Sequence, residues 1–299
     1  MEEQWNVFGA IEAGGTKFEC GLGTNPDDLE VVRIPTTSPQ ATIASVIGFL
    51  KEKSQGRLKS VGIGSFGPID LHPKSPTFGF ITSTPKAGWQ NCDIAGAFRK
   101  ALGVPVGIDT DVSAAALGER RWGAAQGLSD FVYLTVGTGI GGGAIVNGNV
   151  LHGLQHPEMG HIRIPHDWTV DPFRGVCPFH GDCLEGIASG RSMQARWGVT
   201  ARELPLEHPG LALEARYLAL GLANFIFTLS PQRILLGGGV MQQEQLFTLI
   251  RLELAPLLGN YVPAGERDDL ATYIIPPGLA DRAGILGALI LAERAAAEG

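Results

Sequence analysis

Short apolar runs alternate with amphipathic stretches along this chain, and the first of them predict strands. Residues 5–11, 18–22 and 29–34 are apolar runs of strand length, and a Gly-Gly turn joins the first two, as in a β-hairpin. Residues 41–53 have helical periodicity, and residues 60–65 form a further apolar run. The chain is therefore expected to start with three strands, an amphipathic helix and a buried strand.

The next stretch completes a first α/β segment. Residues 72–91 are rich in Pro, Thr, Ser and Gly, which predicts a long loop of the kind that often carries function. Residues 94–102 are expected to form a helix and residues 104–108 a strand. Asp111 then precedes the alanine-rich stretch SAAALGERRWG, which predicts another helix.

A similar order begins again after residue 130. Residues 131–136 predict a strand, the glycine-rich residues 137–143 a turn, and residues 144–146 a returning strand, before a hairpin turn at 147–149. VFGAIEAGGTKFECGLG and VYLTVGTGIGGGAIVNG thus share an apolar strand, a turn with Gly and Thr, and a returning strand. We interpret this as an internal duplication; the alternative is a coincidence between two glycine-rich hairpins.

Strands and helices also alternate in the rest of the chain. Helices are expected at residues 184–196 and 211–229, a strand at 233–236, a helix from Val240, a strand at 272–275 and a helix at 282–298. Strands that alternate with helices after each three-strand start predict a mixed sheet covered by helices on both faces. The predicted fold class is α/β, in two related halves.

Composition narrows the class of protein. With 299 residues the chain is long enough for two domains, and 44% apolar with 18% charged residues is typical of a folded soluble protein. The net charge of −7 argues against non-specific nucleic-acid binding, and no apolar run reaches the length of a membrane span. The acidic start is unlike a secretory signal, and four cysteines fit a reducing cytoplasm better than a disulfide scaffold.

Three glycine-rich turns are candidate phosphate sites, because glycine lets backbone N–H groups approach phosphate oxygens and a Thr hydroxyl adds a donor. They contain Gly14, Gly15 and Thr16; Thr138 and Gly139; and Gly237, Gly238 and Gly239. A single such turn is more often a structural hairpin. Three of them, two in matching places, favour a nucleotide site that is split between two halves, since neither a Walker A nor a Rossmann motif is present.

Asp111 lies where a predicted strand ends and a helix begins. It could be a capping carboxylate, which stabilises a helix by about 1 kcal/mol. It could also be a general base, because a helix N-terminus keeps a carboxylate ionised and ready to accept a hydroxyl proton during phosphoryl transfer.

The last candidate is a cluster of metal ligands. Cys177, His180 and Cys183 have the spacing C-x2-H-x2-C, and His161 lies upstream. Thiolates and imidazoles at such short gaps suit tetrahedral zinc, although unconnected loop residues are the alternative. Four N/S ligands would close the coordination shell, so we expect a structural rather than a catalytic zinc that fixes its loop. Glu158 and Glu185 bracket the cluster, either as surface charges or as groups that this loop positions.

The segments EAGGTK, GIDTDVSAAALGE, LTVGTGIGGG, PEMGHIRI, CPFHGDCLEGIASG and LLGGGV resemble the successive signatures of the ROK family of bacterial sugar kinases and repressors. They occur in family order from about residue 8 to 290, and EAGGTK with CPxHxxCLEG resembles the fructokinase branch. The resemblance implies a duplicated ribonuclease H-like fold of the actin/hexokinase type, with a cleft between two lobes. We predict an N-terminal lobe at 1–117, with helix 283–299 packed back on it, and a C-terminal lobe at 118–282 with a zinc-binding loop at 156–186.

The resemblance also implies roles. Asp111 would be the catalytic base, ATP with Mg2+ the phosphoryl donor, and a hexose, most of all D-fructose, the acceptor. Glu158, His161 and Glu185 would hold or adjoin sugar hydroxyls, with Gly67 as a further substrate-binding candidate. The nucleotide candidates are the three glycine-rich turns together with Lys17, and His161, Cys177, His180 and Cys183 would bind structural zinc.

Three departures from the family pattern are visible. Glu12 stands where Asp is common, which bears on how Mg2+ is held; Ser113 stands where Asn is usual; and CPFHGDC replaces the commoner C-x-C-G-x2-G-C. The first strand begins so near the N-terminus that we expect no helix-turn-helix of the repressor type. We therefore expect a cytoplasmic homodimer that binds a hexose and ATP but neither nucleic acid nor membrane. The alternatives are mannose or glucose as main substrate, a non-catalytic sugar sensor, or a zinc hydrolase.

Overall fold

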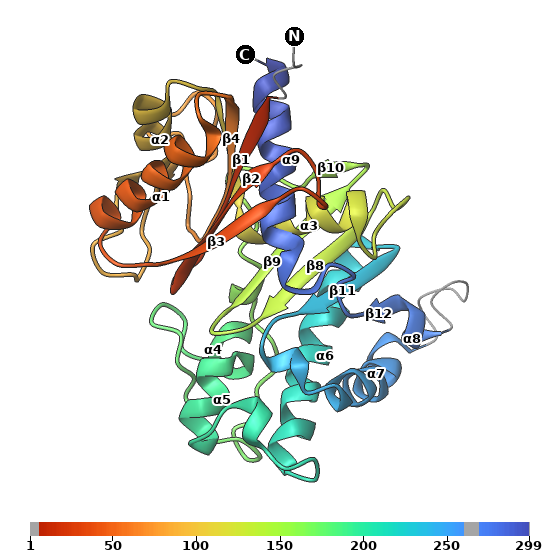
Figure 1. The fold of residues 1–299 in the computed structure, drawn as a ribbon. Coiled ribbons are helices and arrows are strands. Elements are labelled where there is room, and N and C mark those ends of the chain that lie inside the picture. The colour runs from red at the N-terminus through yellow and green to blue at the C-terminus, as the bar shows by residue number, and fades with distance from the viewer. Residues whose placement is uncertain (1–5, 260–268, 299) are drawn as a thin grey trace. The chain divides into compact units, whose positions relative to one another are not determined.

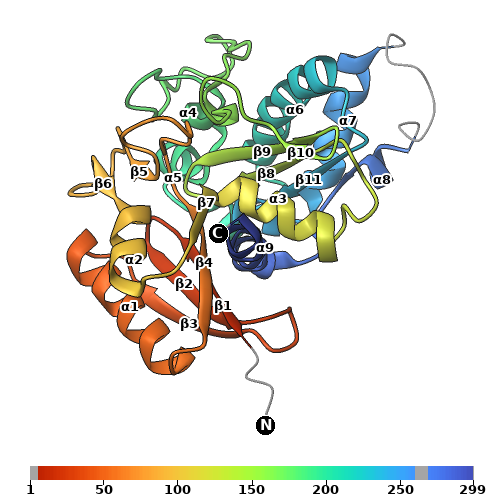
Figure 2. The ribbon, with the colours of Figure 1, turned by 90° about the horizontal axis from the view of Figure 1, so that it is seen from above.

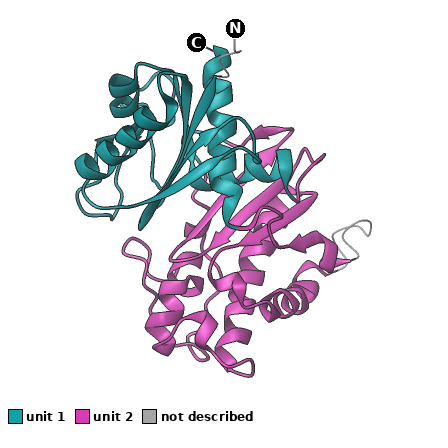
Figure 3. Ribbon diagram, in the orientation of Figure 1, with its two compact units in different colours: residues 1–123, 152–156, 281–299 teal, residues 124–151, 157–280 magenta. Residues whose placement is uncertain are grey.

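The structure is a computed structural model that describes residues 6–259 and 269–298. It divides into two compact units (Figure 3). Unit 1 comprises residues 1–123, 152–156 and 281–299, and unit 2 comprises residues 124–151 and 157–280. Each unit has its own hydrophobic core and its own five-stranded sheet.

The sheet of unit 1 combines a meander with parallel strands. In order across the sheet its strands are β3 (Glu30–Pro35), β2 (Lys17–Gly23), β1 (Val7–Ala13), β4 (Leu58–Ser65) and β7 (Val106–Thr110). The first three pair antiparallel, while β4 and β7 continue the sheet in parallel. These are the strands expected from the apolar runs, although Trp5, the predicted start of the first strand, lies outside the described residues.

Helices cover both faces of this sheet (Figures 1 and 2). On one face lie α1 (Pro39–Ser54) and α2 (Ile94–Leu102), and on the other α3 (Asp111–Trp122) and α9 (Ala283–Glu298). The long loop after β4 carries only the two-residue strands β5 (Phe80–Ile81) and β6 (Cys92–Asp93). The core between the sheet and α1/α2 contains Trp89 and Phe98, both fully buried.

The sheet of unit 2 repeats the arrangement of unit 1. Its strands, in order, are β10 (Asn149–Val150), β9 (Ile140–Val146), β8 (Phe131–Val136), β11 (Arg233–Gly237) and β12 (Ile274–Ile275). Again the first three pair antiparallel and the last two are parallel to the central strand. In each unit the strands, numbered by their order along the chain of that unit, lie across the sheet in the order 3-2-1-4-5. The shared order confirms the predicted duplication.

The helices of unit 2 pack mainly against one another and this sheet. They are α4 (Leu184–Ala188), α5 (Gly190–Trp197), α6 (Pro209–Leu229), α7 (Gln245–Leu258) and α8 (Leu270–Tyr273), with single 3-10 turns at Met159–His161, Ala201–Glu203 and Val240–Gln242. By length and composition α6 is the one candidate membrane span among the described residues, but 67% of its apolar window is buried inside the unit. Helix α6 is therefore a core helix of this unit, which explains its apolar composition.

The predicted turn at 137–143 is wrong in its extent. The antiparallel pairing of β8 with β9 begins at Val136 opposite Ile140, so the turn is only Gly137–Gly139 and the later glycines belong to a strand. They remain in the sheet because the hairpin ladder continues along them, from Thr135 opposite Gly141 to Phe131 opposite Ile145.

Three other elements differ from expectation. The helix predicted at 184–196 is broken at Ser189, whose side chain caps α5 at Ser192 N. The helix expected from Val240 is one 3-10 turn, and α7 begins only at Gln245. Of the strand predicted at 272–275 only the last two residues are extended, because Asp269 caps a helical turn before them by accepting from Ala271 N at 2.9 Å.

Candidate functional site

The first glycine-rich turn joins β1 to β2 in unit 1 and is open. Gly14 N donates to Lys17 O at 3.0 Å, and a Cβ on Gly14 would come within 2.7 Å of the same oxygen, so this tight turn requires glycine. Around Gly15, by contrast, no atom of the described residues other than its two chain neighbours lies within 4 Å of an added Cβ. Thr16 is exposed. Lys86 Nζ donates to Gly15 O, so the long loop brings a second positive charge to the turn.

Lys86 was not among the candidates from sequence. It lies in a Pro- and Ser-rich loop, and only the fold shows that it approaches a turn that is 71 residues away in the chain. The loop's composition predicted function in general terms, but it could not indicate which residue contacts the turn.

Asp111 lies at the first position of α3, immediately after β7. Thr110 caps the helix by accepting from Ser113 N at 3.1 Å, and Asp111 Oδ1 accepts from Val112 N at 2.8 Å. Ser113 is buried and its hydroxyl accepts from Thr110 Oγ1 at 2.8 Å, which ties it to the cap. The carboxylate of Asp111 is thus held at a helix N-terminus, where the partial positive charge of the helix favours its ionised form.

Glu12, at the carboxyl end of β1, is electrostatically linked to Asp111. Burial raises the pKa of Glu12 to about 7, and the negative charges of Asp111 and Glu19 add to the shift, while Lys17 opposes it. Its Oε2 atom is buried and has no hydrogen-bond partner among the described residues. Unit 1 thus carries a second carboxyl group close enough to Asp111 for the two negative charges to interact.

Gly67 follows β4 and precedes Pro68 through a cis peptide bond. Within unit 1 it lies against His156, whose ring atoms would be 3.5 Å from a Cβ at this position. His156 Nε2 accepts from Ile69 N at 3.1 Å, so this histidine fixes the backbone that carries Gly67. Nearby in the chain, a hydrogen bond with Asp109 raises the pKa of His152.

The other two glycine-rich turns lie side by side in unit 2. They follow the parallel neighbours β8 and β11, where Gly237 pairs with Thr135. Gly238 has φ +96°, and a Cβ there would overlap with the backbone of Val136. The structure therefore brings Thr138 and Gly139 next to Gly237, Gly238 and Gly239 at one edge of the sheet. The third turn lacks the expected α-helix, since only a 3-10 turn follows it.

The four predicted metal ligands converge in unit 2. The ligand atoms of His161, Cys177, His180 and Cys183 all lie within 4.8 Å of one another. Nδ1 of His161 is 3.7 Å from Cys177 Sγ and 3.5 Å from Cys183 Sγ, and Nδ1 of His180 is 3.7 Å from Cys177 Sγ. In tetrahedral zinc, bonds of about 2.3 Å to sulfur and about 2.0 Å to nitrogen separate the two kinds of ligand by about 3.5 Å. The cluster fits zinc in both chemistry and size.

The two glutamates that bracket the cluster are close to each other. Burial raises the pKa of Glu158; the charge of His161 opposes the shift and that of Glu185 adds to it. Glu185 lies in the first turn of α4, two residues after the N-cap Cys183, and its Oε2 accepts from Ile140 N at 2.9 Å. Both carboxylates therefore belong to one site with His161.

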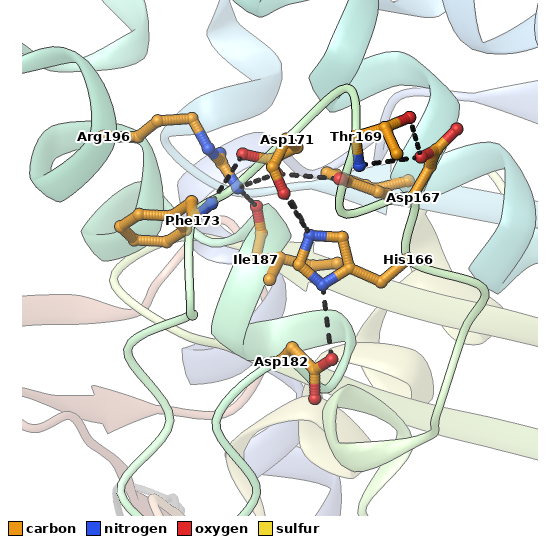
Figure 4. A network of polar contacts seen from close by, with 9 residues as sticks. His166, Asp167, Thr169, Asp171, Phe173, Asp182, Ile187 and Arg196 are labelled. Atoms are coloured by element: carbon orange, nitrogen blue, oxygen red, sulfur yellow. Dashed lines mark hydrogen bonds and ion pairs between the residues drawn. The ribbon is translucent and has the colours of Figure 1, made fainter.

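A buried polar network, which the sequence did not reveal, also holds the loop between residues 166 and 182 (Figure 4). The ring of His166, 2% exposed, contacts Asp171 O at 2.9 Å and Asp182 Oδ2 at 3.2 Å. Asp171 Oδ2 in turn accepts from Arg196 at 3.0 Å and from Tyr217 OH at 2.7 Å. The loop is thus tied to α5 and α6 by bonds that need no metal. No local spacing indicates such a network, because its members are 5 to 46 residues apart in the chain.

Two sheets with one strand order, each carrying glycine-rich turns at the strand ends, define a duplicated ribonuclease H-like fold of the actin/hexokinase type. Comparison with known proteins agrees. A structure of the ROK hexokinase from Thermus thermophilus has a TM-score of 0.79 and 28% sequence identity, covering 98% of this chain and 100% of that one. A ROK family glucokinase from Streptomyces griseus, solved with glucose and AMPPNP, has a TM-score of 0.75 and 26% identity over 97% and 100%.

Sequence comparison gives the family. Residues 8–295 match the ROK family, and the chain belongs to it. A fructokinase from Zymomonas mobilis is 43% identical in an alignment of 304 positions that covers 98% of this chain and 98% of that protein. The resemblance identified from the motifs is therefore confirmed over nearly the whole chain.

Proposed function

We propose that this protein is an ATP-dependent fructokinase that transfers the γ-phosphoryl group to D-fructose and forms fructose 6-phosphate. The choice of fructose is supported by the 43% identity to the Zymomonas mobilis fructokinase, against 28% and 26% to the ROK hexokinase and glucokinase structures. ATP as donor is supported by the AMPPNP bound to that glucokinase. Mannose and glucose are the competing substrates.

The observation that carries the proposal is the position of Asp111. A carboxylate at the start of α3, next to the partial positive charge of the helix N-terminus, is suited to accept the proton of a sugar hydroxyl as that oxygen attacks phosphorus. Phosphoryl transfer otherwise requires positioning and charge stabilisation more than covalent chemistry. We assign Asp111 the role of general base.

The hexose is held by polar groups of the loop that contains the metal cluster. Carboxylates accept hydrogen bonds from sugar hydroxyls, and Glu185 lies close enough to Glu158 for its negative charge to raise the pKa of Glu158. His161 uses Nδ1 toward the cluster, which leaves Nε2 for a hydroxyl. Gly67, on the backbone fixed by His156, is the proposed substrate contact from unit 1.

ATP is bound by the glycine-rich turns. The turn with Gly14, Gly15 and Thr16, together with Lys17, offers backbone N–H groups and charge to phosphate, and Thr138 and Gly139 with Gly237, Gly238 and Gly239 do so in unit 2. Mg2+ accompanies the nucleotide and prefers oxygen ligands. The neighbouring carboxylates of Glu12 and Asp111 fit that preference, directly or through water.

Zinc has a structural role in this proposal. His161, Cys177, His180 and Cys183 would complete its tetrahedral shell, so no ligand position remains for a reacting water, which argues against a zinc hydrolase. Bound zinc supplies a fixed cross-link that holds His161 and the start of α4. We further propose, on the basis of the family resemblance, a cytoplasmic homodimer that binds neither nucleic acid nor membrane. Its lobes correspond to units 1 and 2, so the predicted boundary at residue 117 moves to 123 and residues 152–156 join the first lobe. Sedimentation velocity tests the dimer.

A coupled ADP-release assay over D-fructose, D-mannose and D-glucose tests the proposed function. We expect the highest kcat/KM with fructose, and ADP formation that depends on the sugar. A non-catalytic sugar sensor would bind hexose without consuming ATP. Equal or higher kcat/KM with mannose or glucose would instead assign the enzyme to those sugars.

A further inference from the structure

Glu185 lies directly over the turn that joins β8 to β9. Its Oε2 accepts from Ile140 N at 2.9 Å. A Cβ atom added to the preceding residue, Gly139, would overlap with the same Oε2 and come within 3.1 Å of Glu185 Cδ. The three atoms nearest to such a methyl group all belong to Glu185. The carboxylate of Glu185 therefore occupies the space that a side chain at position 139 would need.

The turn itself does not explain this glycine. Gly139 does not have the positive φ that favours glycine, unlike Gly238 in the neighbouring turn. Alanine would therefore not be strained by a left-handed backbone here, and the obstacle to a side chain is Glu185. The sequence pattern placed Gly139 among the phosphate-binding residues, but its surroundings indicate a second use.

The other sugar-binding segment rests on the same strand in a similar way. A Cβ on Gly142 would come within 2.6 Å of Met159 Sδ, and one on Gly160 would overlap with Ile140 O. Met159 and Gly160 are the residues between Glu158 and His161. The segment that carries Glu158 and His161 and the segment that carries Glu185 thus both pack closely against the first half of β9, because glycines at the contacts leave room for them.

The segment that carries Glu185 is fastened to the turn at two points. Besides the bond from Ile140 N, Gly190 N donates to Gly137 O at 2.7 Å, just beyond the end of α4. At the other end of α4 its N-cap is Cys183, one of the four metal ligands. Residues 137–140 and 183–190 are therefore connected to each other at both ends of α4.

We propose that Gly139 is a positioning residue of the hexose site, acting through Glu185. By leaving room for the carboxylate it allows Oε2 to accept from Ile140 N–H, which orients Oε1 toward a sugar hydroxyl. The inference rests on the proposed function and adds to it, because the turn that contacts the nucleotide also sets the geometry of sugar binding. A ligand that shifts this turn changes the affinity for the sugar, and by thermodynamic reciprocity the sugar changes the affinity for that ligand.

Calorimetric titration of Gly139→Ala with D-fructose in the absence of nucleotide tests this proposal. The added methyl group displaces the carboxylate of Glu185. We therefore expect the Kd for fructose to rise at least about tenfold, which corresponds to the loss of one charge-assisted hydrogen bond to the sugar. If Gly139 served phosphate alone, the fructose Kd would stay within twofold while the KM for ATP rose, and the proposal would be overturned. Gly48→Ala is the matched control, because a Cβ at Gly48 in α1 has no neighbour within 4 Å in the part of the chain that the structure describes, apart from its own helix and adjoining residues.

A double-mutant cycle with Glu185→Asp separates positioning from general damage. The shorter side chain withdraws its carboxylate from the added methyl, so the double variant should lose less fructose affinity than the product of the two single losses. Independent, multiplicative losses would contradict the proposal. If Gly139→Ala alone loses its zinc, recovery of zinc content in the double variant supports the role of Glu185, and no recovery overturns it. Wild-type protein that binds no fructose would instead refute the proposed function.

Discussion

The hairpin turns of the two units occupy the same place in two sheets of the same strand order, yet their surroundings differ. In unit 1 Gly14 is required by the turn, and Gly15 faces open space. In unit 2 the corresponding turn is covered by Glu185, which takes the room beside Gly139. A duplicated scaffold thus keeps its glycines for different physical reasons. The first turn stays open for a ligand, whereas the second also supports the side chain proposed to bind sugar.

The largest expected effect lies in unit 2 and concerns zinc. Removing the metal by chelation, or replacing Cys183 by Ser, should lower the Tm and raise the KM for fructose at least about tenfold, because structural zinc contributes on the order of 10 kcal/mol to the folding of its site. Cys92→Ser in unit 1 is the control, since Cys92 lies outside the cluster. The zinc content by mass spectrometry should fall from one per chain to none. Metal-free protein that kept its affinity for fructose would contradict this role.

The next effect belongs to unit 1 and to the chemical step. Asp111→Asn removes the proposed base, so kcat should fall at least about 10²-fold while the Kd for fructose changes little. Rapid-quench turnover and calorimetry measure the two quantities separately. Asp27→Asn, on an exposed loop of the same unit, should leave both unchanged. Undiminished turnover of Asp111→Asn would remove Asp111 from the base role.

A smaller effect tests the carboxylate pair in unit 1. The pKa of Glu12 is raised from 4.5 to about 7, so between these values the folded chain holds a proton that the unfolded chain has released. Stability without nucleotide or Mg2+ should therefore fall as the pH rises from about 5 to 7.5, by roughly 2.5 kcal/mol, since each pKa unit is worth about 1.4 kcal/mol.

Glu12→Gln should abolish this fall and be the more stable protein at pH 8, as measured by urea unfolding at several pH values. Glu207→Gln, at an exposed position, should follow the wild type. Parallel stability curves for Glu12→Gln and wild type would show that Glu12 is not the titrating group.

The smallest effect sharpens the comparison of the turns. Gly15→Ala places a methyl group in open space, so folding and the fructose Kd should stay unchanged. The methyl hinders only an approaching phosphate, and the KM for ATP should rise by a factor of about five, equivalent to about 1 kcal/mol. If Gly15→Ala weakened fructose binding as much as Gly139→Ala, the two turns would not differ in the way their surroundings indicate.

Much of the fold could be predicted because it depends on local patterns. Strand-length apolar runs separated by Gly-Thr turns indicated both hairpins, and the common sheet order confirms the duplication. The C-x2-H-x2-C spacing likewise anticipated that Cys177, His180 and Cys183 converge, with His161 added from upstream. In each case residues close in sequence carried the signal.

The errors concern positions that are decided by distant partners. The helix break at Ser189 adjoins Gly190, which donates to Gly137, 53 residues earlier in the numbering of the chain. Glycine-rich residues after Gly139 looked like a turn, but pairing with β8 makes them a strand. No sequence pattern singled out His166 or Asp171, and only the packing of the loop on α5 and α6 buries them. Periodicity carries no information about such contacts.

The most direct test of the central claim is to follow the product of one reaction by 31P and 13C NMR, with purified protein, ATP, Mg2+ and D-fructose. The account predicts that ADP and a single phosphomonoester form in equal amounts, that the phosphate is on C6 of fructose, and that D-glucose under the same conditions reacts at least about tenfold more slowly. ADP without sugar phosphate, or glucose phosphorylated as fast as fructose, would contradict it.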